Sequence, residues 1–97
     1  MDATIGRIEA TEGNRDALAR ALVDEVGEMP GCLSYLVSID PEDAAGVWIA
    51  ECWMNAEAHA EWLATDATRA LVARIAPLMV GYSERHEVEP VGLTVLQ

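Results

Sequence analysis

The sequence contains no lysine and no phenylalanine, and only two of its 97 residues are cysteines. The basic side chains are six arginines, set against 17 acidic residues, so the formal net charge is −11. A chain this acidic repels nucleic acid and anionic membrane surfaces, and neither is an expected partner. No apolar run approaches the roughly 20 residues that span a bilayer, so no membrane segment is predicted.

The chain also lacks the common signatures of secretion and of metal binding. It does not open with a basic segment followed by an apolar run, so no signal peptide is predicted and a cytoplasmic protein is the default. Cys32 and Cys52 form no Cys-x-x-Cys motif and are expected to be reduced and inert. His59 and His86 are the only histidines and stand in no metal-ligand spacing, so no metal site is predicted.

A strand followed directly by a helix, residues 47–63, holds most of the side chains that could carry chemistry. Alternation places Glu51 and Trp53 on one face of the strand together with apolar residues. Both faces are largely apolar, so both are expected to be buried, and Glu51 is a carboxylate within a core strand. Asn55 can cap the helix that follows, on which His59 and Trp62 share a face.

The rest of the chain predicts further elements within a single domain, residues 1–97. They are a strand at 3–9, a helix from Asn14 to about Met29, a strand at 32–39, a hairpin loop at 40–46, a second helical segment capped by Thr65 or Asp66 and ended by Gly81, a strand at 82–88, and a short edge strand or arm at 93–96.

The resulting order is β-α-β-β-α-β. Short hairpins and right-handed crossovers favour a ferredoxin-like α+β fold, an antiparallel sheet with both helices on one face. The other face of the sheet still carries apolar side chains that need cover in a chain this small. A second copy of the same sheet supplies that cover most simply, which predicts a symmetric homodimer.

Three segments resemble the antibiotic biosynthesis monooxygenase domain family: Pro-Gly-Cys with a tyrosine at 30–35, Glu-x-Trp at 51–53, and the capped helix at 57–65. The resemblance covers nearly the whole chain and includes the closing segment at 91–96. It implies a dimeric α+β barrel. Family members include small oxygenases that act on quinols or polyketide aromatics without a metal or organic cofactor. Others are isomerases or haem-degrading enzymes, and many have no assigned activity.

The chain departs from the family pattern in two ways. Many members carry a histidine where this chain has Trp62, with another near Ala67, whereas His59 is the histidine on this helix. The haem-degrading branch uses an asparagine, a tryptophan and a haem-ligating histidine at positions that align with Gly6, Trp62 and Val72. Only the tryptophan is present, so haem cleavage by that route is not expected.

Cofactor-free oxygenation needs a dry aromatic pocket, a base and a partner for an oxyanion. Glu51 and His59 are the candidate bases, and the sequence leaves open which of them acts. In the alternative interpretation His59 is a partly exposed helix residue without a role, and Glu51 is a structural carboxylate bound to Arg7 or Arg85. Three aromatic side chains could bind a flat substrate, or else only pack in the core: Trp62, Tyr35 and Trp53.

These features predict a cofactor-independent monooxygenase that acts on a small aromatic or quinol-type substrate. Two alternatives have the same fold. One is a non-catalytic small-molecule-binding or stress-related dimer, and the other is an isomerase of a small hydroxy-carbonyl compound. An enzyme should show a pocket that reaches His59 or Glu51, whereas a binding protein should show an apolar pocket without a positioned base.

Overall fold

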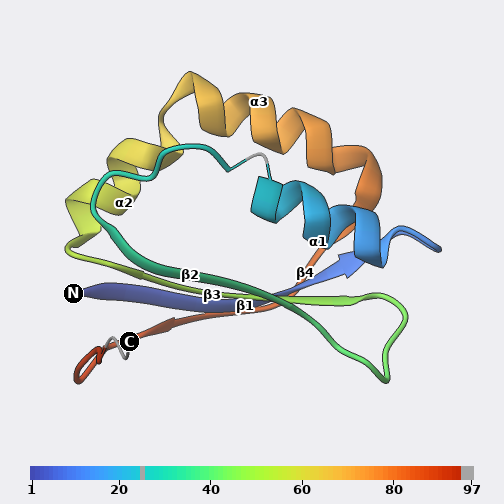
Figure 1. The fold of residues 1–97 in the computed structure, drawn as a ribbon, viewed down its shortest axis with the longest axis horizontal. Coiled ribbons are helices and arrows are strands. Elements are labelled where there is room, and N and C mark those ends of the chain that lie inside the picture. The colour runs from blue at the N-terminus through green and yellow to red at the C-terminus, as the bar shows by residue number, and fades with distance from the viewer. Residues whose placement is uncertain (25, 95–97) are drawn as a thin grey trace.

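The computed structural model describes residues 1–24 and 26–94, which form a four-stranded antiparallel sheet with three helices on one face (Figure 1). The elements in chain order are β1 (Asp2–Ala10), α1 (Arg15–Asp24), β2 (Cys32–Ile39), β3 (Gly46–Trp53), α2 (Ala56–Leu63), α3 (Asp66–Ile75) and β4 (Met79–Val88). The strand order is β2-β3-β1-β4, with every neighbouring pair antiparallel. The predicted ferredoxin-like α+β fold is therefore confirmed, with the second helical region divided into α2 and α3. Among the described residues, no helix combines the length and the apolar character needed to cross a membrane.

Side-chain caps fix where the two helices that follow β3 in the chain begin. The side chain of Asn55 accepts a hydrogen bond from the backbone nitrogen of Ala58 at 2.8 Å, which starts α2 as the sequence predicts. The hydroxyl oxygen of Thr65 accepts from the backbone nitrogen of Thr68 at 3.2 Å and starts α3. Because these caps set where each helix begins, they also set which side chains face the sheet.

Two predicted helix ends are wrong, and both errors have a backbone cause. The first helix ends at Asp24 and not near Met29. Gly27 adopts a left-handed conformation with φ of 68°, which is incompatible with continuing a right-handed helix. Met29 still packs against the core, but from a non-helical segment.

The last helix ends at Ile75 and not at Gly81. Pro77 has no backbone N–H to donate, and the chain passes through a 3-10 turn at Ala76–Leu78. The final strand accordingly begins at Met79, three residues before the predicted start, and Gly81 lies inside it. Leu93 and Thr94 are not part of a strand, and the remainder of the predicted segment at 93–96 lies outside the described residues.

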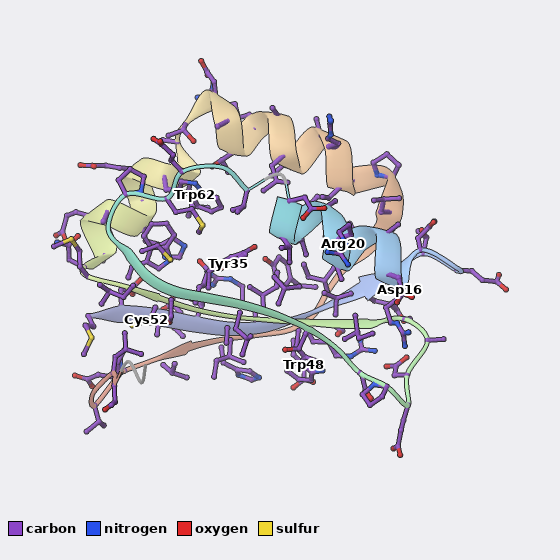
Figure 2. The ribbon with its side chains drawn as sticks, in the orientation of Figure 1. Asp16, Arg20, Tyr35, Trp48, Cys52 and Trp62 are labelled. Carbon is purple, nitrogen blue, oxygen red and sulfur yellow. The ribbon has the colours of Figure 1, made fainter. Side chains whose placement is uncertain are left out.

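The hydrophobic core lies between the sheet and the helices. Its largest fully buried side chains come from two strands, β1 and β3, and from α1: Trp53, Ile8, Leu18 and Val47. The opposite face of the sheet carries Trp48 and Cys52, which point away from the helices in Figure 2. Several large apolar side chains on that face are exposed, among them Ile5, Leu36 and Val88. On β3 itself the face toward the helices is buried except for the half-buried Glu51, while on the opposite face Cys52 is buried and Trp48 and Ala50 are half-buried.

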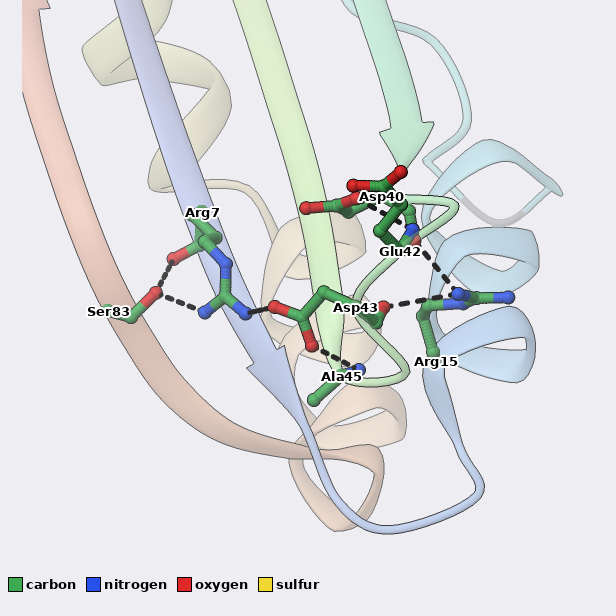
Figure 3. A network of polar contacts seen from close by, with 7 residues as sticks. All are labelled: Arg7, Arg15, Asp40, Glu42, Asp43, Ala45 and Ser83. Carbon is green, nitrogen blue, oxygen red and sulfur yellow. Dashed lines mark hydrogen bonds and ion pairs between the residues drawn. The ribbon is translucent and has the colours of Figure 1, made fainter.

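A polar network fastens the loop between β2 and β3 to the rest of the sheet (Figure 3). Arg7 on β1 forms an ion pair with Asp43 of this loop and donates to the hydroxyl of Ser83 on β4 at 2.7 Å. Arg15 at the start of α1 donates to the backbone oxygens of Asp40 and Asp43 at 2.9 and 3.1 Å. The two arginines thus hold the hairpin loop from both sides of the sheet.

Candidate functional site

A cavity of about 360 Å³ lies between the sheet and the helices α2 and α3. It lies at the lower end of the usual size range for small-molecule pockets, so it suits a small ligand. Most of its walls are apolar or aromatic. The side chains that matter for chemistry or recognition are Tyr35 on β2, Glu51 on β3, His59 and Trp62 on α2, and Tyr82 and Arg85 on β4.

Three titratable side chains from three elements, Asp2, His59 and Glu51, form a chain of polar contacts at one end of this cavity. The Nε2 atom of His59 lies 3.1 Å from Oε1 of Glu51, and its Nδ1 atom lies 2.9 Å from Oδ2 of Asp2. Asp2 reaches this position because β1 and β3 pair antiparallel with Asp2 opposite Trp53. His59 is buried, and the imidazole ring is held on both of its nitrogen atoms.

Trp53 supports this chain from within the core. Its indole is fully buried and stacks on the imidazole of His59, with ring centroids 4.9 Å apart and an angle of 10° between the planes. Its Nε1 atom donates to Oε1 of Glu51 at 2.9 Å. Trp53 does not line the cavity, so the structure places it behind the site and not against a ligand.

The contacts of His59 limit how it can share protons with the two carboxylates. An ionised carboxylate can only accept hydrogen bonds, and a neutral imidazole has one donor and one acceptor nitrogen. The Nδ1 contact with Asp2 has hydrogen-bond geometry, whereas Nε2 lies at ion-pair distance from Glu51. With a proton on each nitrogen, the imidazolium and the two carboxylates would carry a combined charge of −1.

Trp62 and the two tyrosines make the aromatic part of the cavity wall, and Figure 2 shows Trp62 and Tyr35 between the helices and the sheet. Burial raises the pKa of Tyr35, and the nearby carboxylate of Glu51 raises it further. The pKa of Tyr82 is raised for the same two reasons, with Arg85 acting in the opposite direction. Both phenols are therefore neutral hydrogen-bonding groups at ordinary pH.

Gly6 makes room for one of these rings. A methyl group at Gly6 would lie 3.0 Å from Cε1 of Tyr82, closer than side chains normally approach. The absence of a side chain at Gly6 therefore permits the close approach of Tyr82. Without a side chain on Gly6, the phenol ring can lie against β1 at the edge of the cavity.

The structure brings four of the five predicted site residues to the cavity: Glu51, His59, Trp62 and Tyr35. The alternative interpretation of Glu51 is wrong in its partners, because Arg7 pairs with Asp43 and Arg85 pairs with Glu87 at 3.8 Å. His59 is buried and not partly exposed as that interpretation assumed.

Sequence reasoning missed three residues of this site. Asp2 could have been found by extending the first strand by one residue and pairing it with the strand that ends at Trp53. Tyr82 and Arg85 line the same cavity although strict alternation puts them on opposite faces. The pairing register between β4 and β1 shifts after Arg7, because Arg7 pairs with Glu84 and the next residue of β1 pairs with Tyr82. This bulge places the side chains of Tyr82 and Arg85 on the same face of the sheet, toward the helices.

The side chains of Asp2, His59 and Glu51 do not converge on a common point, because the imidazole lies between the two carboxylates. Among the residues that the structure describes, no group of histidine, cysteine, aspartate or glutamate side chains could hold a metal ion.

The family comparison covers most of the chain. The sequence profile of the family described as antibiotic biosynthesis monooxygenase matches residues 1–74. The chain belongs to this family. The matched segment includes Asp2, Glu51, His59 and Trp62.

Solved structures of other antibiotic biosynthesis monooxygenase family proteins share the fold. A protein from Chloroflexus aurantiacus J-10-fl, provisionally assigned to these monooxygenases, is 40% identical, with a TM-score of 0.91 over 99% of this chain and 98% of that chain. A protein from Deinococcus radiodurans with the same provisional assignment is 23% identical, with a TM-score of 0.78 over 100% and 99% of the two chains, which shows the fold alone. The comparison with curated proteins gives no match.

Proposed function

We propose that this family member is a cofactor-independent monooxygenase of a small aromatic or quinol-type substrate. The observation that carries the proposal is the Glu51 carboxylate, which lies at the wall of a mostly apolar cavity and is held by His59 and Trp53. Such a cavity supplies the dry aromatic environment and the positioned base that direct reaction with dioxygen requires.

Glu51 is the better candidate for the base. Both ring nitrogens of His59 are occupied by carboxylate oxygens, which leaves the imidazole no free lone pair for a substrate. The hydrogen bond from Trp53 and the ion-pair contact with His59, the contacts of this carboxylate found among the described residues, both involve Oε1 of Glu51, so Oε2 remains to accept a proton from a ligand. His59 then serves to position and charge-balance Glu51.

The reaction balances with the substrate and dioxygen alone. Glu51 removes a proton from an acidic C–H or O–H group, and the resulting anion transfers one electron to dioxygen. The substrate radical and superoxide combine to form a carbon–oxygen bond. The O–O bond of this peroxide breaks as a proton returns to the distal oxygen, so that one oxygen atom remains on the substrate as a carbonyl. The other oxygen leaves as water together with the second hydrogen of the oxidised carbon.

Arg85 and Tyr82 supply the partners for the oxyanions of this sequence. Both line the cavity from β4, on the side of β1 opposite Glu51. A guanidinium group stabilises a phenolate or peroxide oxygen by charge, and a neutral phenol can donate a hydrogen bond to it. The cavity therefore has a proton acceptor toward β3 and hydrogen-bond donors toward β4.

The proposal extends to the assembly and to the compartment. A homodimer would cover the apolar face of the sheet that one chain leaves open. Cys32 and Cys52 are both free thiols, which suits the reducing cytoplasm.

Oxygen consumption with a panel of hydroquinones and fused-ring phenols tests the function. Replacing Glu51 with Gln keeps the size of the side chain and removes the base, so turnover should fall about 100-fold or more. Glu61→Gln is the matched control, because Glu61 is an exposed acid on α2, and it should turn over at the parent rate. Oxygen uptake by Glu51→Gln at the parent rate would exclude Glu51 as the base. Conversion of a hydroxy-carbonyl compound without oxygen uptake would favour the isomerase, and binding without any conversion would favour the binding protein.

A further inference from the structure

We infer that Asp2 is a positioning residue of this site, which keeps His59 as an imidazolium and thereby holds a cation beside the Glu51 carboxylate. The inference rests on the proposed function for its catalytic consequence, but its structural part can be measured without turnover. It concerns a residue at the start of β1 that does not line the cavity.

The geometry leaves His59 little freedom to act in any other way. Asp2 and Glu51 lie 2.9 and 3.1 Å from its two nitrogen atoms, on opposite sides of the ring. The indole of Trp53 stacks on one face of the imidazole and prevents it from tilting out of line. Asp2 has the most exposed of the three side chains, at 31%, against 11% for His59 and 13% for Glu51. Asp2 is thus the member of the chain that faces solvent.

The shared protons belong on the imidazole. A carboxylate lies at ion-pair distance from each ring nitrogen, and imidazole is a stronger base than a carboxylate by about two pH units in water. The arrangement that follows is an imidazolium between two carboxylates. Removing the charge of Asp2 while keeping its shape would leave a single carboxylate partner, and the ring could then satisfy both contacts with one proton.

Other titratable groups surround the chain without contacting the ring. Four of these groups interact electrostatically with Glu51 or line its cavity: Cys32 and Tyr35 on β2, and Tyr82 and Arg85 on β4. On α2, Glu57 and Glu61 are exposed. The Met1 amine adjoins Asp2 in the sequence. Within the described residues, only Asp2 and Glu51 lie within ion-pair distance of His59. The charge of His59 is therefore set mainly by these two carboxylates.

Nitrogen-15 NMR of the imidazole side chains tests the structural part. At pH 7 both nitrogens of His59 in the parent should show the shifts of protonated nitrogen, and the signals of exposed His86 serve as an internal reference for the assignment. Asp2→Asn should convert His59 to a neutral ring with one N–H, and Asp2→Glu should restore the charged form. Glu9→Gln is the matched control, because it removes one acidic charge from an exposed position of the same strand and should leave the His59 signals unchanged.

The pH profile of kcat/KM tests the catalytic part. Without the neighbouring cation, a carboxylate holds its proton to higher pH, so the acidic limb for Asp2→Asn should move up by about one unit. A purely structural role would lower the rate without moving this limb. A neutral His59 in the parent at pH 7 overturns the inference even if no Asp2 variant folds. If Asp2→Asn keeps the pH profile of the parent while Glu51→Gln is inactive, the role of Asp2 is also overturned, but the proposed function still stands. Failure of the parent to turn over any compound contradicts the proposed function alone.

Discussion

Among the aromatic residues, we expect the indole of Trp62 to contribute most directly to ligand binding. It lines the cavity, packs at 5.5 Å from the ring of Trp53, and its Nε1 atom is buried without a hydrogen-bond partner in the described part of the chain. Trp62→Ala should weaken the binding of an aromatic ligand by about 1–3 kcal/mol, measured by fluorescence or calorimetric titration, because a flat buried contact is lost. Trp48→Ala removes an indole from the other face of the sheet and should leave affinity unchanged. Equal losses in both variants would show that Trp62 does not contact the ligand.

Tyr35 gives the protein a predictable sensitivity to alkaline pH. Burial, and then the charge of Glu51, raise its pKa, so the folded state holds the phenolic proton more tightly than the unfolded chain. The stabilisation is complete below the pKa of an unfolded tyrosine, about 10, and is lost as the pH rises beyond it. Tyr35→Phe should reduce the fall in the urea midpoint between pH 8 and pH 11. Some fall should remain, because the pKa of Tyr82 is raised as well. An unchanged fall in Tyr35→Phe would contradict this assignment.

At the scale of elements, the hairpin loop between β2 and β3 gives the fold a sensitivity to acid. A hydrogen bond from the backbone nitrogen of Ala45 and the contact with Arg7 lower the pKa of Asp43. The resulting stabilisation is present above the pKa of an unfolded aspartate, about 4, and is lost as the pH falls through the lower folded value. Asp43→Asn should flatten the dependence of the thermal midpoint on pH between 5 and 2. Asp66→Asn, at an exposed acid on α3, should keep the parent slope, and a reduced slope there would point to general charge effects instead.

Local patterns predicted those elements whose faces are set by near neighbours in sequence. Alternation along β3 placed Glu51 with Trp53, and helical spacing placed His59 with Trp62, as the structure has them. The site beyond these residues depends on pairing between distant segments. Asp2 meets His59 only because β1 pairs with β3, a contact between residues far apart in the chain.

The final strand shows why a correct strand prediction can still give the wrong face. One extra residue in β4 opposite Arg7 exchanges the two faces, so Tyr82 and Arg85 come to share the cavity. No residue type in this strand marks such a bulge from the sequence alone, since neither Ser83 nor Glu84 requires an unusual backbone conformation. The oxyanion partners of the proposed reaction were therefore beyond the reach of alternation, whereas the base and the aromatic wall were not.

At the scale of the whole molecule, the open face of the sheet determines the expected assembly. The helices cover one face, while Ile5 on β1 and Leu36 on β2 remain 39% and 61% exposed on the other. A stable symmetric dimer buries about 800 Å² of each partner. Light scattering at micromolar concentration should therefore report roughly twice the chain mass of 10.5 kDa.

Leu36→Glu tests which face forms this interface. In a symmetric dimer the substitution places two carboxylates in one buried apolar layer, so the protein should become monomeric while its circular dichroism stays that of the parent. Val23→Glu is the control, because Val23 is a similarly exposed apolar residue at 51% but lies on α1, away from the open face, and this variant should remain dimeric. A Leu36→Glu protein that keeps the dimer mass would place the interface elsewhere, and a parent that is monomeric and fully folded would exclude the dimer.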